Sequence, residues 1–382
     1  MDIPFGNKQF THQGDPEIEK YVRDLLERIT SLILMKINPI AVFLYGSLGR
    51  GEGTLYLEDG RLIMSSDFEM GIVSKKWSDR KRLRALMARV ENHIGHEVTL
   101  SFFSPKRIRL ATSSNFSLFP SSVPTIESYE ISESAFFLYG DDLRTKKSFL
   151  DSEFIPLWEG LRLLFNRMAE FVIAFHNGNE NEQVKAFNKM RIACGDALLV
   201  TIHRYHYLYR QRLDNLEEYW EEIQKQNPAL RDDHFEFIRK GYRWKLVPQE
   251  NLVAMSNFDY GRLSELARTI LNYVANLDMN ITSFDSNEFS REYLESPKLK
   301  KEYYKGISGH PLMQNLVSFL QGRIPFNIYL SNIGSQQSLI HRVYAYIPGI
   351  FFEQLGRLSR KKSVRLCAKD QQTLEMYGRL LA

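Results

Sequence analysis

Two short stretches carry the clearest signal in this chain, YGSLGRGE at residues 45–52 and SDFEM at residues 66–70. The first follows Ile40–Tyr45, whose branched and aromatic residues favour a buried strand. The second places Asp67 and Glu69 at alternate positions of a second expected strand, Asp67–Val73. Alternate side chains of a strand share one face of the sheet. The two stretches therefore predict a glycine-rich turn and a pair of carboxylates that serve one site.

The two carboxylates stand between apolar neighbours, since Asp67 and Glu69 alternate with Phe68 and Met70. Like charges at this spacing are costly unless a cation lies between them. Magnesium prefers hard oxygen ligands and usually takes a few carboxylates together with phosphate oxygens. We therefore expect Asp67 and Glu69 to be catalytic and to hold one or two Mg²⁺ ions.

The glycine-rich segment Gly46–Gly53 predicts a turn rather than a strand or a helix interior. Backbone N–H groups of such a turn, beginning at Gly46, bind phosphate, and the Ser47 hydroxyl adds a further donor. Arg50 is placed to offer its charge to the same phosphates. A glycine-rich turn alone would be weak support, because glycine serves any tight turn. Its order and strand context relative to the carboxylates strengthen the nucleotide-binding interpretation.

The surrounding sequence predicts an α/β unit with a mixed sheet. Apolar residues at three-and-four spacing predict amphipathic helices over Pro16–Lys36 and Asp79–Ile94. Leu55–Met64 reads as a hairpin around Asp-Gly, the favoured tight-turn pair. Glu97–Phe103 is the third expected core strand.

Strand patterns fade after Pro156, and long helices are expected over Leu157–His176 and Val184–Tyr209. The chain is therefore divided into an α/β catalytic domain at residues 1–150 and an all-helical C-terminal domain at residues 151–382, with a sub-boundary allowed near 285–300. We expect the site to lie between the two domains.

The two motifs resemble the signature of the nucleotidyltransferase superfamily, which includes aminoglycoside nucleotidyltransferases, minimal nucleotidyltransferases and DNA polymerase beta. The chain matches at Gly46-Ser47 and at Asp67-Phe68-Glu69. A second similarity is Phe137–Leu143, which looks like the closing segment of such domains in bacterial members. The resemblance covers residues 20–150. One departure is the long interval 48–66 between the motifs, which the expected hairpin would absorb.

The resemblance implies further site residues. A third carboxylate usually stands on a later strand of the family, and Glu97 is the candidate for this metal ligand and for the general base. Thr99 occupies the competing position, and Glu97 could equally be a solvated strand-edge residue. A lysine of the helical domain often reaches the triphosphate in the family. Lys189 is that candidate, with Lys185 one turn earlier, although a solvent-facing helix lysine is the plain alternative.

The resemblance implies a nucleotidyltransferase that moves a nucleoside monophosphate from an NTP, with ATP as the expected donor, onto a hydroxyl acceptor and releases pyrophosphate. The acceptor is a small molecule or a protein, and nucleic acid is not favoured, because the net charge is only +4. The alternative is a non-catalytic nucleotide-binding or regulatory module, or a component of a toxin–antitoxin-type pair, because fold does not determine function.

Bulk properties predict a soluble, cytoplasmic protein. In its 382 residues, 43% are hydrophobic and 25% are charged. The two cysteines, Cys194 and Cys367, fit a reducing compartment and exclude a disulfide scaffold. No secretory signal is expected at the N-terminus, and the apolar runs are too short to cross a membrane. The sequence does not indicate an oligomeric state.

Overall fold

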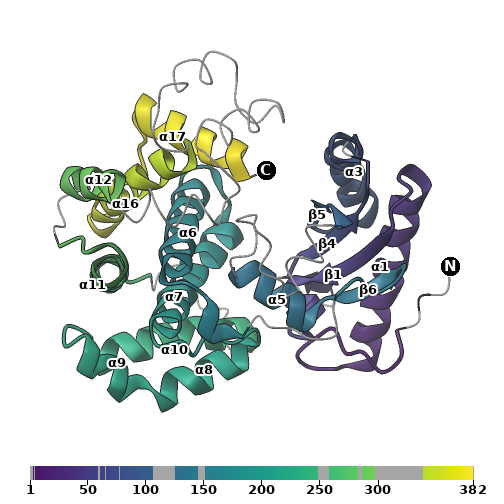
Figure 1. Ribbon diagram of the computed structural model, residues 1–382, viewed down its shortest axis with the longest axis horizontal. Coiled ribbons are helices and arrows are strands. Elements are labelled where there is room, and N and C mark those ends of the chain that lie inside the picture. Colours follow the sequence, from purple (N-terminus) through teal and green to yellow (C-terminus); the bar gives the residue numbers. More distant parts are fainter. Residues whose placement is uncertain are drawn as a thin grey trace.

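The computed structural model describes residues 3, 5–58, 61–64, 66–76, 78–105, 125–144, 151–247, 258–282, 286–296 and 339–381. Over these residues the chain is a mixed α/β protein whose later part is helical (Figure 1). Figure 1 shows α6 and α7 on one side of the sheet, and α1 and α3 on the side that faces away from them. α5 lies between the two halves. This confirms an α/β part with a mixed sheet followed by a helical part.

The main sheet has the strand order β5-β4-β1-β6. β4 pairs with β5 in parallel, whereas β1 pairs with both β4 and β6 in antiparallel fashion. A separate two-stranded sheet joins β2 and β3 as the predicted hairpin. The strands are β1 (Ala41–Tyr45), β2 (Leu55–Glu58), β3 (Arg61–Met64), β4 (Phe68–Val73), β5 (Val98–Phe103) and β6 (Phe136–Tyr139).

One face of the main sheet packs against two helices and forms the core of the α/β half. Val42, Leu44 and Met70 project from this face and are fully buried. They pack with apolar side chains of α1 (Pro16–Lys36) and α3 (Asp79–Ile94). Because side chains alternate along a strand, Tyr45 and Glu69 project from the opposite face, toward the helical half.

Both predicted helices of this half form over the predicted residues. α1 begins at the N1 proline, Pro16, and the Asp15 carboxylate accepts hydrogen bonds from the backbone N–H groups of Glu17 and Ile18. α3 ends at Gly95, which adopts a left-handed conformation at φ 76°. The strands begin and end within one residue of their expected bounds, and Asp67 lies just before β4 rather than inside it.

The prediction of a turn at the first glycine-rich segment was wrong over Gly46–Arg50, which forms the short helix α2. α2 begins directly after β1 and ends at Gly51, whose φ of 82° is readily adopted only by glycine. Leu48 on α2 is fully buried and compensates for the low helix propensity of its glycine neighbours. The segment therefore joins β1 directly to a short, buried helix.

The helical part has one large apolar core, in which α6 packs along α7. The predicted helix Val184–Tyr209 was too long: α7 ends at Thr201, and His203 just beyond it has a φ of +58°, which does not continue a right-handed helix. The α-helices of this part are α6 (Leu157–Asn177), α7 (Glu180–Thr201), α8 (Tyr209–Glu218), α9 (Trp220–Gln226), α10 (Asp232–Leu246), α11 (Tyr260–Met279), α12 (Ser286–Glu295), α16 (Leu339–Ser359) and α17 (Ala368–Leu381). They are preceded by a 3₁₀ turn, η2 (Ser152–Phe154), and by α5 (Ile126–Ser134) next to the sheet.

The predicted domain boundary at residue 150 ends a segment, 145–150, that lies outside the described residues. The sub-boundary allowed near 285–300 falls on the helix Ser286–Glu295, with residues 285 and 297–300 outside the described residues. Among the helices that are described, none has both the length and the apolar character that a membrane crossing requires.

Candidate functional site

The two predicted carboxylates lie on the sheet face that is turned toward the helical half. Glu69 in β4 has Tyr45 of β1 on one side and Thr99 of β5 on the other. Asp67 precedes it by two residues, and the Thr99 hydroxyl lies 3.4 Å from an Asp67 carboxylate oxygen. Both carboxylates are half-buried. We call Asp67 and Glu69 the carboxylate pair.

Gly46, the first residue of α2, lies directly against one member of the pair. It has a φ of +66°, and an ideal Cβ built on it would lie 1.6 Å from Glu69 Oε2. A side chain at this position is therefore excluded as long as Glu69 keeps its place. The structure thus brings the two sequence motifs together, although residues 48–66 separate them along the chain.

The environment of Glu69 disfavours its negative charge. Burial and the nearby Asp67 carboxylate raise the pKa of Glu69 to about 7, while Arg50 and Lys189 act in the opposite direction. A bound cation stabilises the ionised form of such a carboxylate, because it offsets both the burial and the repulsion from the neighbouring carboxylate. The pair is therefore electrostatically suited to a divalent ion.

The third position of the predicted site is occupied by Thr99 rather than by Glu97. Thr99 is the register partner of Glu69, whereas Glu97 precedes β5 and its side chain is 65% exposed. Glu97 Oε2 lies 3.8 Å from Lys185 Nζ of α7 instead. The structure therefore does not bring Glu97 into a group with the carboxylate pair, and this position offers a hydroxyl in place of a carboxylate.

The oxygen atoms that the site offers fit magnesium in kind. Asp67 and Glu69 present carboxylates and Thr99 a hydroxyl, all of them hard donors. Over the described part of the chain, no group of three or more His, Cys, Asp and Glu side chains is placed to hold a metal ion. Two carboxylates remain compatible with Mg²⁺, because this ion commonly completes its shell with water and substrate phosphates.

Sequence reasoning missed one residue of the site, Lys245 near the end of α10. Its ammonium donates a hydrogen bond to Ser66 Oγ at 3.1 Å, next to Asp67. Burial, Arg50 and Lys189 lower the pKa of Lys245 to about 7, against the opposing effect of the carboxylate pair. No local pattern marks this lysine, because only the packing of α10 against the α/β half brings it to the site.

The predicted phosphate lysine, Lys189, also lies on the site side of the helical half. It is exposed on α7, and its charge acts on the titration of Glu69, Lys245 and Glu170. Lys185, one turn earlier, pairs with Glu97 as described above. Positive charge from two different helices, α7 and α10, therefore faces the carboxylate pair.

The other two predicted phosphate-binding residues are placed differently. Ser47 is buried in α2, and its carbonyl oxygen accepts the backbone N–H of Glu52 at 2.9 Å. Arg50 is buried as well, and its guanidinium donates to the Glu130 carboxylate at 2.8 Å and lies 3.7 Å from Glu52. The Arg50 side chain, 4% exposed, is thus engaged within the protein and does not face an open phosphate site.

Polar contacts fasten the helical half to the segment after α2. The Glu52 carboxylate accepts the backbone N–H groups of Tyr209 and Arg210 at 2.9 and 3.2 Å, which satisfies the start of α8. The Thr54 hydroxyl donates to the backbone carbonyl of Lys245 at 2.9 Å. These bonds hold α8 and α10 close to the carboxylate pair.

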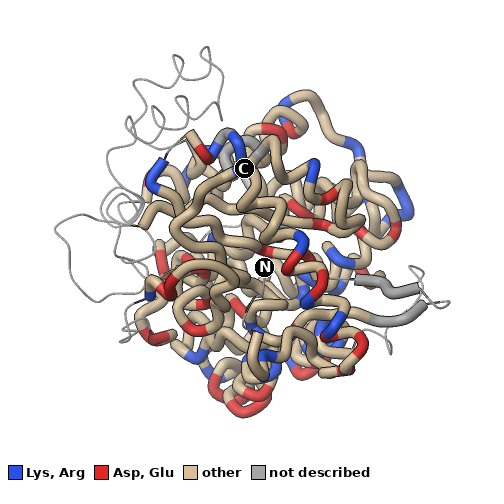
Figure 2. Tube along the Cα trace, turned by 90° about the vertical axis from the view of Figure 1, so that its right-hand side faces the viewer, with Lys and Arg blue, Asp and Glu red and all other residues tan. Residues whose placement is uncertain are grey.

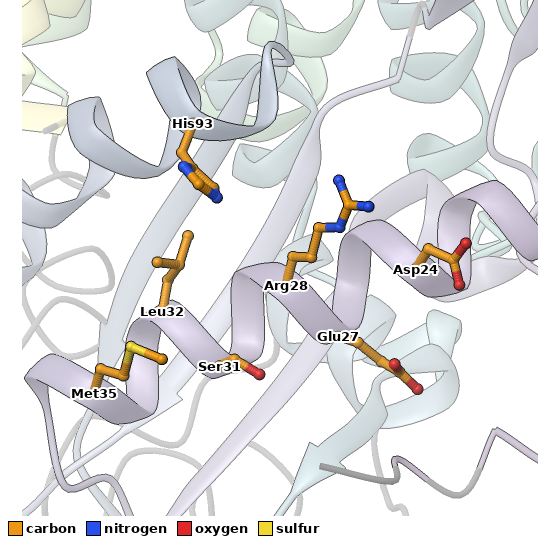
Figure 3. Close-up of a pocket in the computed structure, with 7 residues that line it drawn as sticks. All are labelled: Asp24, Glu27, Arg28, Ser31, Leu32, Met35 and His93. Atoms are coloured by element: carbon orange, nitrogen blue, oxygen red, sulfur yellow. The ribbon is translucent and has the colours of Figure 1, made fainter.

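A surface hollow of about 400 Å³ lies elsewhere, between α1 and α3 (Figure 3). In Figure 3, Leu32 on α1 points toward His93 on α3, Arg28 extends from α1 further along the helix, and Asp24 and Glu27 continue along α1. α1 and α3 cover the sheet face opposite the carboxylate pair, so the hollow is separate from the candidate site. We assign the site from the chemistry of its residues and not from the size of a hollow.

Charge on the molecule is mixed in sign. Figure 2 shows Lys and Arg positions interspersed with Asp and Glu positions over the side that it presents. This agrees with the small net charge and offers no broad basic face in that view. No family model, curated protein or solved structure matches this chain.

Proposed function

We propose that the chain is a nucleotidyltransferase that moves a nucleoside monophosphate from an NTP, ATP being the expected donor, onto a hydroxyl acceptor. The single observation that carries this proposal is the close approach of Gly46 to Glu69, with Asp67 on the same face. At the junction of β1 and α2, the backbone of Gly46 carries no side chain and lies beside two carboxylates. This arrangement suits a phosphate chain that a divalent ion bridges to the carboxylates.

Mg²⁺ fits this site by its donor atoms, and Asp67 and Glu69 would hold it. When bound, magnesium neutralises charge on the phosphate oxygens and the leaving pyrophosphate. The carboxylate pair supplies the anchoring charge, and Thr99 keeps Asp67 in place through its hydroxyl. The raised pKa of Glu69 means that protons compete with the cation at and below neutral pH.

The helical half supplies the positive charge that a triphosphate needs. Lys245 and Lys189 face the carboxylate pair from α10 and α7. A phosphate next to Lys245 would favour its charged form and strengthen the contact. Burial of the lysine strengthens the interaction further, because the local dielectric is low.

In the proposed reaction an acceptor hydroxyl oxygen attacks the α-phosphorus of the NTP. A new oxygen–phosphorus bond forms, the bond from the α-phosphorus to the bridging oxygen breaks, and pyrophosphate leaves. The hydroxyl proton passes to water. The protein acts by positioning the reactants and by neutralising charge, which is the main source of rate enhancement in phosphoryl transfer.

The acceptor is proposed to be a small hydroxylated molecule or a protein side chain. The net charge of only +4, together with charges of both signs on the side that Figure 2 presents, gives no support for a nucleic-acid acceptor.

A second candidate function is nucleotide binding without catalysis, as a regulatory module or as part of a toxin–antitoxin-type pair. One observation favours it: Thr99 stands where a third carboxylate would complete the site. A site with two carboxylates can bind a metal–nucleotide complex while lacking a base for the acceptor.

The experiment that separates the two functions incubates the protein with each NTP labelled at the α-phosphate, Mg²⁺ and a cell extract. The transferase predicts label on an extract molecule and release of pyrophosphate, and both are lost in Asp67→Asn. Labelled NTP that binds but is never consumed, with the wild-type protein and a broad acceptor panel, would support the binding module instead.

A further inference from the structure

A half-buried carboxylate outside the proposed metal site joins the two halves of the molecule. Glu130 on α5 accepts a hydrogen bond from Arg50 of α2 at 2.8 Å and is paired with Arg212 of α8. The Tyr205 hydroxyl, from the connection before α8, donates a third bond at 2.6 Å. The Arg50 and Arg212 side chains are only 4% and 2% exposed. Protein partners, rather than water, must therefore balance these charges.

The same network continues to the helix that carries Lys245. Arg212 donates to the Asp196 carboxylate of α7 at 2.9 Å, and the Tyr242 hydroxyl of α10 donates to the same carboxylate at 2.6 Å. Tyr242 precedes Lys245 on α10 by less than one helical turn. An unbroken series of buried and partly buried hydrogen bonds thus runs from α2 to α10.

Positive and negative side chains alternate along this network of hydrogen bonds. Although burial opposes its charged form, the Arg50 and Arg212 guanidiniums hold the pKa of Glu130 below its usual value. Arg50 also lies over the Tyr209 ring, with 4.9 Å from its guanidinium carbon to the ring centroid. Removing one partner would leave a buried charge without compensation, which is strongly destabilising. Arg50 is therefore held in the network and is not released toward a ligand.

We propose that Glu130 is a positioning residue that fixes where α10, and with it Lys245, lies relative to α2 and the carboxylate pair. We call this relative placement of the two halves their registration. The network links the two sides of the site but touches neither proposed phosphates nor metal. Its effect on turnover rests on the proposed function, whereas the registration of the two halves does not. The first test therefore measures registration without any nucleotide.

That test uses the contact between Glu97 and Lys185, which joins the start of β5 to α7. Both are changed to cysteine in a Cys367→Ser background, which removes the exposed native thiol, while Cys194 is buried. A short thiol cross-linker then reports how often the two halves are correctly placed. We expect Glu130→Gln to slow cross-linking severalfold, and the exposed neighbour on α5, Glu133→Gln, to leave the rate unchanged.

Circular dichroism checks that each cross-linking variant is folded. If Glu130→Gln does not fold, the double variant Glu130→Gln with Arg50→Met removes both charges of one pair and leaves Arg212 with Asp196, so that the measurement can still be made. A folded variant without the Glu130 carboxylate that cross-links at the wild-type rate would overturn the proposal.

A double-mutant cycle on nucleotide turnover separates positioning from direct phosphate binding by Arg50. Positioning predicts that Glu130→Gln and Arg50→Met each lower kcat/KM for the NTP by about 10- to 30-fold, through the displaced Lys245, and that the double variant is no worse than either. Direct binding by Arg50 predicts a raised KM in Arg50→Met alone, and losses that add. Additive losses would overturn the proposal.

The two tests also distinguish this proposal from the proposed function. Slowed cross-linking in a protein that never consumes an NTP would contradict the transferase and support the registration. Wild-type cross-linking in the Glu130→Gln variant of an active enzyme would support the transferase and contradict the registration.

Discussion

Gly46 and Glu69 are in such close contact that no side chain fits between them: an ideal Cβ on Gly46 would lie 1.6 Å from Glu69 Oε2. Gly46 also has a φ of +66°, which residues other than glycine adopt at a cost. The start of α2 is therefore specified by two independent constraints, its backbone conformation and the carboxylate beside it. Each constraint can be tested separately.

Gly46→Ala should displace the Glu69 carboxylate and lower the affinity for Mg²⁺–ATP by about 100-fold, because a metal ligand is lost along with the approach of the backbone to the phosphates. The protein should remain folded, since Glu69 can move at its flexible end. Isothermal titration calorimetry measures the affinity.

The control for this variant is Gly95→Ala at the end of α3, where φ is +76° and nothing lies within 4 Å of the added Cβ. It should cost about 1 kcal/mol of stability through backbone strain alone and leave binding unchanged. Equal affinities for the Gly46 and Gly95 variants would show that the contact with Glu69 has no functional role.

Glu69→Gln should stabilise the metal-free protein at alkaline pH. The pKa of Glu69 is raised to about 7 in the fold, above its ordinary value of 4.5, so the folded state holds this proton more tightly than the unfolded state does. Stability from this group is therefore present at low pH and is lost as pH rises from about 4.5 to 7. The neutral glutamine avoids that loss.

Urea unfolding without metal should show Glu69→Gln about 2 kcal/mol more stable than wild type at pH 8, and less than about 0.5 kcal/mol more stable at pH 4.5. Excess Mg²⁺ should remove the advantage, because the ion stabilises only the wild-type carboxylate. A stability difference that does not change with pH would contradict the raised pKa.

Thr99→Asp should create the third carboxylate that the sequence lacks at this position, and tighten Mn²⁺ or Mg²⁺ binding by about tenfold. Glu97→Gln should change the affinity by less than about twofold, because its exposed side chain faces Lys185 and not the pair. Titration of both variants with Mn²⁺ measures these affinities. Loss of metal binding in Glu97→Gln would restore Glu97 as the third ligand.

Lys245→Met should weaken ATP binding by about 10- to 30-fold, because a charge-assisted contact to phosphate is lost from a buried position. Lys240→Met, at an exposed position of the same helix, is the matched control and should bind normally.

Proton uptake gives a second measurement on Lys245. Its pKa in the free protein is about 7, and a bound phosphate would raise it, so wild type should take up nearly one proton per ATP bound at pH 8 and far less at pH 6. Calorimetry in buffers of different ionisation heat measures the uptake. Equal uptake by wild type and Lys245→Met would show that this lysine does not titrate with the ligand.

Local patterns were sufficient to predict much of the fold. α1 and α3 occupy the predicted residues because periodic apolar side chains, Asp15 before Pro16, and Gly95 mark their faces and ends. The core strands were similarly marked by short apolar runs. The junction at Gly46 could not be assigned as helix, because its glycines favour a turn locally and the burial of Leu48 on α2 is a tertiary contact.

The candidate site was predictable where its residues lie close together along the chain. Asp67 and Glu69 share a face by strand alternation alone, whereas the choice between Thr99 and Glu97 depends on the register of β4 with β5, which sequence does not reveal. Lys245 and Glu130 enter through the packing of α10 and α5, far from the motifs in sequence. Arg50 was assigned to phosphate because its acceptor, Glu130, lies far away in the sequence and could not be known.

The most direct measurement is the affinity for a non-hydrolysable ATP analogue with and without Mg²⁺, in wild type, Asp67→Asn and Glu69→Gln. We predict that Mg²⁺ tightens binding to wild type by at least about tenfold, and that both variants stay folded but lose this enhancement. An equal Mg²⁺ effect in all three proteins would contradict the claim that Asp67 and Glu69 anchor the metal beneath the nucleotide.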